Sequence, residues 1–465
     1  MINQNIKKII ILILFFPSLK LIYSQSLIEL SKITLENNSD ILSAQNLYES
    51  VILSSKTING AYSPQLSFSS SATLSDEFSW NRNLHYLSSS ISYVQPLLGG
   101  STISITGETI IKRENISTEF YLSQSSNISI SLQQSLLPFW IQGGLKDPTI
   151  ENVFQQKQYY YNQLLDTRKN ILINLAQNYI YALIYQNQFL MLQNSIILIN
   201  EQIDALKQLK KNGTSSPSKI TELLNSKYTL QKDLISIQSN IENYIQNIKI
   251  LCNSNLKINQ LVYPIISTED FLHLIQKVTD NNLDLFEKNY HLTLEMFKLN
   301  RILDKQTSAP IISISIQPSW TMEQRKKSEI TNIWKELRSP SNCSATIEIN
   351  LSPFISATLK QNKEQYKLDY KSILNSYTSY KIQKKAIQEQ YKNLFEQHKK
   401  LLEENKRLYN EGTIELRDMK LQYNAGSISL IDYDSMKIRI ENCNLNMQIC
   451  ELYVWLYELL LKVNQ

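Results

Sequence analysis

The chain has 465 residues, and its 9 Gly and 11 Pro together make up about 4%, where average usage gives roughly 12%. Charged residues are 19% and the formal net charge is +5, which is too weak for a nucleic-acid-binding surface. The 42% of hydrophobic residues excludes a disordered chain, and the scarcity of glycine argues against collagen-like and glycine-loop nucleotide-binding folds. This composition favours long helices combined with polar strands.

Residues 1–24 are predicted to be a secretory signal peptide. Lys7 and Lys8 form a positive region, residues 9–16 are an unbroken apolar run, and Ser24 is a small residue before a possible cleavage point. A non-cleaved anchor is the alternative. After residue 24 no apolar stretch approaches the ~18 residues of a transmembrane helix, so a mature chain that enters a membrane would have to use β-strands.

A helix is predicted over about 26–60, and a region of strands follows over about 64–138. Ser26 and Glu29 have the spacing of a capping box at the start of this helix. In the strand region, apolar and small polar residues alternate with a period of two. This pattern suits an outer-membrane barrel, and it also suits a soluble sheet with one buried face.

Two helices are predicted next, a long one over 148–211 and a shorter one over 217–252. Their lengths correspond to ~96 Å and ~53 Å at the rise of an α-helix. Their apolar residues recur at alternating spacings of three and four, which indicates coiled-coil packing. In the shorter helix this apolar seam consists of Ile220, Leu223, Lys227, Leu230, Leu234, Ile237, Ile241, Tyr244, Ile248 and Leu251.

A stripe of polar residues runs beside the seam of the long helix and is spaced by seven: Gln186, Gln193 and Asn200. A polar stripe next to a packed seam is expected to face water. That water would be the lumen of a pore if the helices surround one, or the bulk solvent otherwise.

After a linker over 254–266, the same order of elements returns. A helix, a strand region over about 310–353, a long helix and a shorter helix make up residues 267–465, in parallel with residues 25–253. The two halves also share an Asn-Asn-x-Asp motif, at 37–40 and 281–284, and a turn glycine, Gly213 and Gly426. The sequence therefore predicts two tandem structural repeats.

The four cysteines are interpreted as small core residues: Cys252, Cys343, Cys443 and Cys450. Export would permit disulfides, but Cys443 and Cys450 lie ~10 Å apart on one helical face and cannot bridge each other. The four histidines are scattered without metal-ligand spacing, and no nucleophile or phosphate-binding motif is present. We therefore expect no metal, no cofactor and no enzymatic activity.

The most informative motif is Tyr423-Asn424-Ala425-Gly426-Ser427-Ile428-Ser429-Leu430-Ile431-Asp432. It resembles the Tyr-x-x-Gly-Thr/Ser turn followed by Leu-x-Asp of the TolC family of outer-membrane efflux proteins. The opening at 37–41 and the Gln95-Pro96-Leu97-Leu98 phrase are similar as well. The resemblance covers the mature chain and implies an α+β membrane protein, a homotrimer with a transmembrane β-barrel, a long periplasmic α-helical barrel and a central pore.

The chain also departs from the pattern of this family. Members usually contribute two strands per repeat, whereas here two extra strands are expected at about 86–95 and 101–111. Whether these strands join the barrel or project outward stays open. Lys219 stands at a tip position where the family often has an acidic residue. Ser435 replaces the family's second Asp, with Asp434 one residue earlier.

A gate is expected at the periplasmic tip, where Gly213 and Gly426 would end the long helices. In a trimer, Asp432 would form a ring of three carboxylates that narrows a pore and favours cations. Alternatively, Asp432 would pair with Arg417 or with a lysine such as Lys219, or it would be a solvated acid at the start of a helix. By resemblance alone, Tyr423 would be its hydrogen-bonding partner.

The resemblance implies an export duct in the outer membrane that works with a periplasmic adaptor protein and an inner-membrane pump. It would pass small molecules or polypeptides and would bind outer-membrane lipids but no nucleic acid. Two alternatives without a pore are a structural coiled-coil protein of the envelope and an adaptor subunit. An adaptor would need a glycine-rich lipoyl-like module, which the sequence lacks.

Overall fold

The computed structural model describes residues 26–464 except 60–62, 77–81, 98–100, 117–118, 136–146, 212–216, 254–260, 262–266, 308, 327–341 and 352–357. The predicted signal peptide, Gly213 and most of the predicted linker therefore lie outside the described residues. The contacts divide the chain into a helical unit (Met1–Asn46, Asn162–Lys288, Tyr377–Gln465) and a strand unit (Leu47–Tyr161, Asn289–Ser376).

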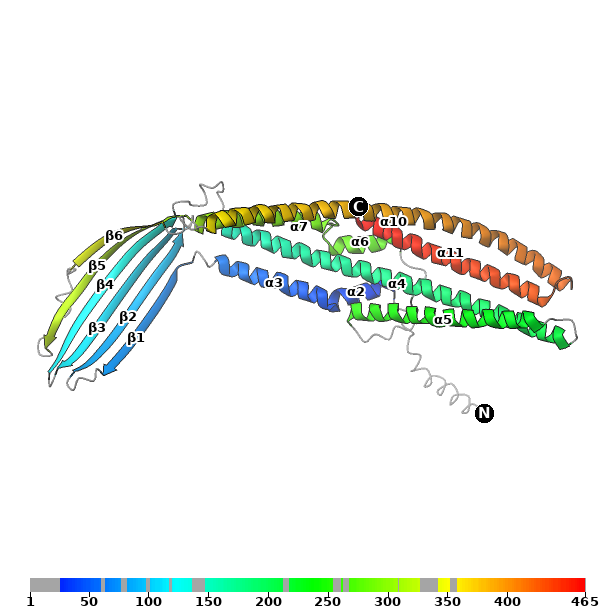
Figure 1. Cartoon of the computed structure of the whole chain (residues 1–465), viewed down its shortest axis with the longest axis horizontal. Helices are drawn as coiled ribbons and strands as arrows, with labels where there is room; N and C mark the ends of the chain where they lie inside the picture. Colours follow the sequence, from blue (N-terminus) through cyan, green and yellow to red (C-terminus); the bar gives the residue numbers. More distant parts are fainter. Residues whose placement is uncertain are drawn as a thin grey trace, which may run out of the picture. The chain divides into compact units, whose positions relative to one another are not determined.

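Six strands of the strand unit form one antiparallel sheet, in which they follow the order of the chain (Figure 1). Their bounds are β1 (Gln65–Asp76), β2 (Arg82–Leu97), β3 (Ser101–Ile116), β4 (Glu119–Ser135), β5 (Ile311–Lys326) and β6 (Asn342–Asn350). The two extra strands expected from the sequence are β2 and β3. Both are longer than expected, and they lie inside the sheet between β1 and β4.

The register gives the sheet one mainly apolar and one mainly polar face, because residues opposite each other on neighbouring strands share a face. Leu66 pairs with Tyr93, Tyr93 with Ile105, Ile105 with Ile130 and Ile130 with Ile316. The alternate positions carry small polar residues, and several hydroxyl pairs are hydrogen-bonded across strands: Ser69 with Ser90, Ser104 with Ser131, and Ser315 with Thr346.

The first half of the chain contributes α2 (Leu27–Asn37), α3 (Ser39–Asn59), α4 (Pro148–Lys211) and α5 (Pro217–Cys252). The second half contributes α6 (Thr268–Val278), α7 (Leu285–Thr307), α10 (Thr358–Asn424) and α11 (Leu430–Asn464). The long helices reach 64 residues in α4 and 67 in α10. None of the described helices combines the length and the apolar character that a membrane-crossing helix needs.

The prediction of one helix over 26–60 is wrong, because the chain breaks at Asn38. Asn38 has extended backbone angles, φ −65° and ψ 128°, and its side-chain oxygen accepts hydrogen bonds from the amides of Asp40 and Ile41 at 3.0 and 3.2 Å. Its side-chain amide donates to the carbonyl of Leu251 at 2.9 Å, which ties the break to the end of α5. The capping box of Ser26 and Glu29 is confirmed.

The second half contains a corresponding break between α6 and α7, at residues 279–284. There Asp284 caps α7, because its carboxylate accepts a hydrogen bond from the amide of Glu287 at 3.2 Å. The Asn-Asn-x-Asp motif therefore marks a helix break in both halves. Asn and Asp favour such breaks because their side chains compete with the helix for backbone amides.

In the helical unit, α5, α4, α11 and α10 lie side by side in that order (Figure 1). The ring of Tyr181 on α4 lies 5.5 Å from that of Tyr244 on α5 and 6.5 Å from that of Tyr453 on α11. On the other side of α11, the ring of His398 on α10 stacks on Tyr453 at 4.4 Å. As a result α4 and α11 have neighbours on both sides, whereas α5 and α10 form the edges.

The core of the helical unit lies where the ends of α2, α5, α6 and α11 meet the middle of α4. The fully buried side chains there include Leu30, Leu172, Leu175, Tyr179, Ile180, Ile248, Phe271, Ile275, Leu456 and Leu459. Burying each such side chain contributes about 1.5–3 kcal/mol. The ring of Phe271 on α6 lies 5.8 Å from that of Trp455 on α11.

The predicted seam of α5 is confirmed, because all of its ten positions are at least partly buried. The cysteine prediction is correct for Cys252 and Cys450, which are buried and free, and Cys443 is partly buried. It is wrong for Cys343, which is exposed on β6, an edge strand of the sheet.

Candidate functional site

The turn between α10 and α11 is built on Gly426, whose φ of +75° lies in the left-handed region. The amide of Gly426 donates to the carbonyl of Tyr423 at 2.9 Å, and the amide of Ser427 donates to that of Gln422 at 2.9 Å. This pair of hydrogen bonds is a Schellman motif, which satisfies the last carbonyls of α10. A side chain at position 426 would strain the backbone, so glycine fixes the end of the helix.

Asp432 lies in the first turn of α11 and forms a capping box with Ser429. The Ser429 hydroxyl accepts a hydrogen bond from the Asp432 amide at 3.2 Å and donates to its carboxylate at 2.6 Å. The Ser429 amide also approaches this carboxylate, at 3.4 Å. The Asp432 side chain is therefore oriented by the start of its own helix and remains exposed to solvent.

The other residues expected at the tip are only partly brought together. Tyr423 stacks on Tyr433 across the turn, with ring centroids 5.6 Å apart. Arg417 on α10 and Lys219 in the first turn of α5 are exposed, and Asp434 on α11 is partly buried. No ion pair between Asp432 and a basic side chain occurs within the described residues.

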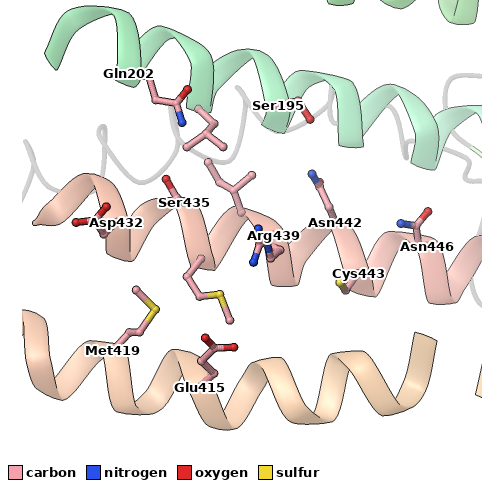
Figure 2. A pocket seen from close by; sticks show the side chains of 13 residues that line it. Ser195, Gln202, Glu415, Met419, Asp432, Ser435, Arg439, Asn442, Cys443 and Asn446 are labelled. Carbon is pink, nitrogen blue, oxygen red and sulfur yellow. The ribbon is translucent and has the colours of Figure 1, made fainter. Parts of the chain in front are cut away.

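Next to this turn lies a groove of about 660 Å³ that belongs wholly to the helical unit. Figure 2 shows α11 running between α4 and α10, with Ser195 and Gln202 on α4 and Glu415 and Met419 on α10. From α11 the groove is lined by Asp432, Ser435, Met436, Ile438, Arg439, Asn442, Cys443 and Asn446. It thus combines carboxylates and a guanidinium group with amides and sulfur-bearing side chains.

The contact between α4 and α11 is polar along the stretch that leads to this groove. Asn187 donates to Gln448 at 3.3 Å, and Asn194 donates to Asn442 at the same distance. Such amide pairs within an otherwise apolar seam specify the register of two helices. These pairs were not predicted from the sequence, although Asn187 and Asn194 are spaced by seven. The groove was missed because its residues come from three helices.

The stripe expected to face water lies one position before these amides on α4. Gln193 is exposed, whereas Gln186 and Asn200 are partly buried. The interaction of α4 with α11 is thus made by Asn187 and Asn194, and not by the stripe itself.

A cluster of tyrosines joins α4, α5, α10 and α11 in the middle of the helical unit. The pKa of Tyr181 is raised to about 12, mainly by burial and to a smaller extent by the nearby Tyr457 and Tyr244. Burial also lowers the pKa of His398, whose Nδ1 lacks a hydrogen-bond partner among the described residues. These shifts keep the cluster uncharged at neutral pH, as expected for packing residues. Within the described residues, no cluster of His, Cys, Asp and Glu could hold a metal ion.

No protein-family model matches the chain, and no curated protein matches it. Solved structures of outer-membrane channels do match, over nearly its whole length. The channel OprN has a TM-score of 0.60 at 12% identity, with 94% of this chain and 89% of the other covered. VceC of Vibrio cholerae has a TM-score of 0.58 at 10% identity, with 94% of this chain and 96% of VceC covered. The open MtrE channel of Neisseria gonorrhoeae has a TM-score of 0.57 at 14% identity, with 93% of this chain and 88% of MtrE covered. The chain therefore has the fold of these TolC-like channels.

Proposed function

We propose that this protein is an outer-membrane efflux channel and not an enzyme. The observation that carries the proposal is the likeness of fold to outer-membrane channels along about 94% of the chain. The two faces of the sheet support it, because an apolar face suits lipid and a face of hydroxyl groups suits a water-filled pore. Residues 1–24 would then direct export and be removed.

The channel would be a homotrimer, in which the edges of one helical unit are covered by its copies. Both edge helices carry large apolar side chains that are exposed in the single chain. On α5, Tyr228 is 72% and Ile235 69% exposed, and on α10, Ile382 is 64% and Ile414 65% exposed. Packing α5 of one copy against α10 of the next would bury these side chains and close a helical tunnel. The sheets would close a barrel in the same way.

The chain would consist of two tandem repeats, residues 25–253 and 267–465, joined by a linker. Each half contains a broken helix, strands, a long helix and a shorter helix, which supports a duplication. The first half differs from the second in having one additional hairpin, formed by β2 and β3.

The gate would lie at the turn between α10 and α11 and at its counterpart near Gly213. Three copies of the exposed Asp432 would surround the pore, with Tyr423, Arg417, Lys219 and Asp434 nearby. The stripe of Gln186, Gln193 and Asn200 would face the lumen. A periplasmic adaptor and an inner-membrane pump would complete the export pathway, as the resemblance implies.

The test is to purify the full-length protein from the outer-membrane fraction and to record its conductance in a planar lipid bilayer. We expect a trimer in native mass spectrometry and discrete channel openings. A monomer that remains in the periplasm, or a trimer without conductance, would favour a structural envelope protein instead.

A further inference from the structure

The sheet of the strand unit is wider than the four strands that the resemblance implies. β2 and β3 do not hang from it as a separate hairpin, because β1 pairs with β2 from Gln65 opposite Val94 to Asp76 opposite Asn83. β3 pairs with β4 from Thr102 opposite Gln133 to Ile116 opposite Glu119. Moving the hairpin out of the sheet would break both ladders.

The two faces of the sheet also continue through β2 and β3. Tyr93 and Ile105 lie between Leu66 and Ile130 in one apolar row across the strands. On the opposite face, Ser104 continues a row of hydroxyl groups from β4 and β5. A hairpin that projected into water would have no reason to carry an apolar row in register with its neighbours.

The two edge strands, β1 and β6, each have a neighbour on one side only within the described part of the chain. Their apolar side chains are unusually exposed: Leu66 is 75%, Phe68 70% and Ile347 73% exposed. Long apolar edge strands promote association unless something covers them. The six strands alternate in direction, so β6 runs antiparallel to β1 and can pair with β1 of a second copy without a change of topology.

We propose that three copies join in this way to close a barrel of eighteen strands, six from each chain, which forms a wide outlet for bulky hydrophilic solutes. This inference rests on the trimeric channel proposed above. Barrel diameter grows roughly linearly with the number of strands, and barrels of 16–18 strands leave an aqueous channel. Eighteen strands instead of twelve widen the barrel about 1.5-fold and its cross-section about 2.2-fold.

The lining of this outlet indicates the kind of solute that passes. The polar face carries mainly Ser, Thr, Asn and Gln. Its charged side chains, among those the structure describes, are Glu108, Lys112 and Glu348. The described charges on this face include both signs, so neither sign dominates this part of the lining, and charge selectivity of a pore depends on rings of like charge or on a narrow bore. Size would therefore be the main limit on the solutes that leave.

Excision of the β2–β3 hairpin tests this inference. β1 ends and β4 begins at the same end of the sheet, so replacing residues 77–118 by a short turn joins these two strands in the antiparallel sense. Electron cryomicroscopy of the trimer should show eighteen strands in the full-length barrel and twelve after excision. In bilayer recordings with polyethylene glycols added from the extracellular side, the largest polymer that enters should be about 1.5-fold smaller in radius after excision. Twelve strands in the full-length trimer, or an unchanged polymer limit, would overturn the proposal.

Disulfide pairs test the same point in the intact chain, in case the excised variant does not fold. In a Cys343→Ser background, Ser69→Cys with Ser90→Cys should cross-link, since their hydroxyl oxygens lie 2.7 Å apart. The matched pair Ser69→Cys with Asn127→Cys should not form a disulfide. These residues lie on β1 and β4, three strand spacings of ~4.8 Å apart, which exceeds the reach of a disulfide. The reverse result would overturn the proposal. A trimer that conducts but has twelve strands contradicts only this inference, whereas the absence of a trimer contradicts the proposed function as well.

Discussion

Lys384 is a partly buried residue of α10, and its ammonium group binds the carboxylate of Asp284 at 2.7 Å. The same carboxylate accepts hydrogen bonds from the Tyr380 hydroxyl and the Glu287 amide, both at 3.2 Å. Burial alone would raise the pKa of Asp284, but the hydrogen bonds from Lys384 and Glu287 and the charge of Lys384 outweigh it and lower the pKa. One residue therefore caps α7 and holds it against α10.

Replacing Lys384 by Met should lower the free energy of unfolding by about 1–3 kcal/mol at neutral pH, because a partly buried carboxylate loses its charged partner. The pKa of Asp284 is lower in the folded protein than its unfolded value of 3.8. The ionised carboxylate therefore stabilises the folded state above pH 3.8, and this stabilisation is lost as the pH falls through the folded-state pKa. The difference between Lys384→Met and the wild type should thus shrink below pH 3.8 in thermal unfolding followed by circular dichroism. Lys385→Met, at an exposed neighbouring position, is the control and should change little.

Replacing Asp432 by Ala tests the proposed gate at the level of a single residue. We expect weaker cation preference and weaker block by divalent ions in a planar bilayer, because a ring of three carboxylates would be removed. The helix should still form, since the Ser429 hydroxyl that accepts from the Asp432 amide is retained. Asp418→Ala, an exposed acid on α10, is the matched control. Unchanged conductance and selectivity in Asp432→Ala would leave this residue as a helix cap only.

At the scale of helices, α10 and α11 approach each other closely at Gly412. A Cβ atom there would lie 3.1 Å from Cγ1 of Ile440, tighter than ordinary contact. Gly412 is also the only glycine within α10, where glycine is about 0.8–1.0 kcal/mol less favourable than alanine. Close packing of Ile440 is therefore the physical reason for a helix-weakening residue at this position.

Gly412→Val should destabilise the protein by about 1–3 kcal/mol, because its branched side chain has to displace Ile440. Gly412→Ala should be nearly neutral, because its gain in helix propensity offsets the tight contact. Unfolding in urea measures both variants. Equal stability of Gly412→Val and the wild type would show that α11 does not pack against this position.

The sequence predicted the helices and strands to a large extent, because their periods are set by single elements. The seam of α5 could be read from the spacing of its apolar residues. The break at Asn38 was missed, although the Asn-Asn-x-Asp motif was recognised, because the motif does not show whether the side chain of Asn38 caps a new helix or points away from a continuous one. In the structure it caps α3 and also contacts Leu251 on α5. The groove beside Asp432 also escaped prediction, since α4, α10 and α11 have to meet before its residues become neighbours.

At the scale of the whole molecule, the most exposed apolar side chains lie on the edges of both units. Among the described residues, every large apolar side chain that is at least 64% exposed lies on α5 or α10 in the helical unit or on β1 or β6 in the strand unit. A chain with such edges is expected to be stable in water only when copies of itself or lipid cover them. Assembly should therefore be more sensitive than folding to a charge placed on one edge.

Ile235→Asp on α5 tests this expectation. The trimer should weaken, because an unpaired carboxylate would be buried in the contact between copies. The helical content of the monomer should stay unchanged, since Ile235 is 69% exposed in the single chain. Native mass spectrometry and circular dichroism measure the two effects. Ser236→Asp, at an exposed neighbouring position, is the control, and equal weakening by both substitutions would argue against this edge as the contact.

The contact of Trp455 with Phe271 also provides a natural optical probe. Trp455 is the one tryptophan in the helical unit, whereas Trp80, Trp140, Trp320 and Trp334 belong to the strand unit. Replacing these four by Phe would leave a single emitter, placed where α6 meets α11. Its emission would shift to longer wavelengths when water enters that junction, so the fluorescence of one residue would report on the helical unit without interference from the strand unit.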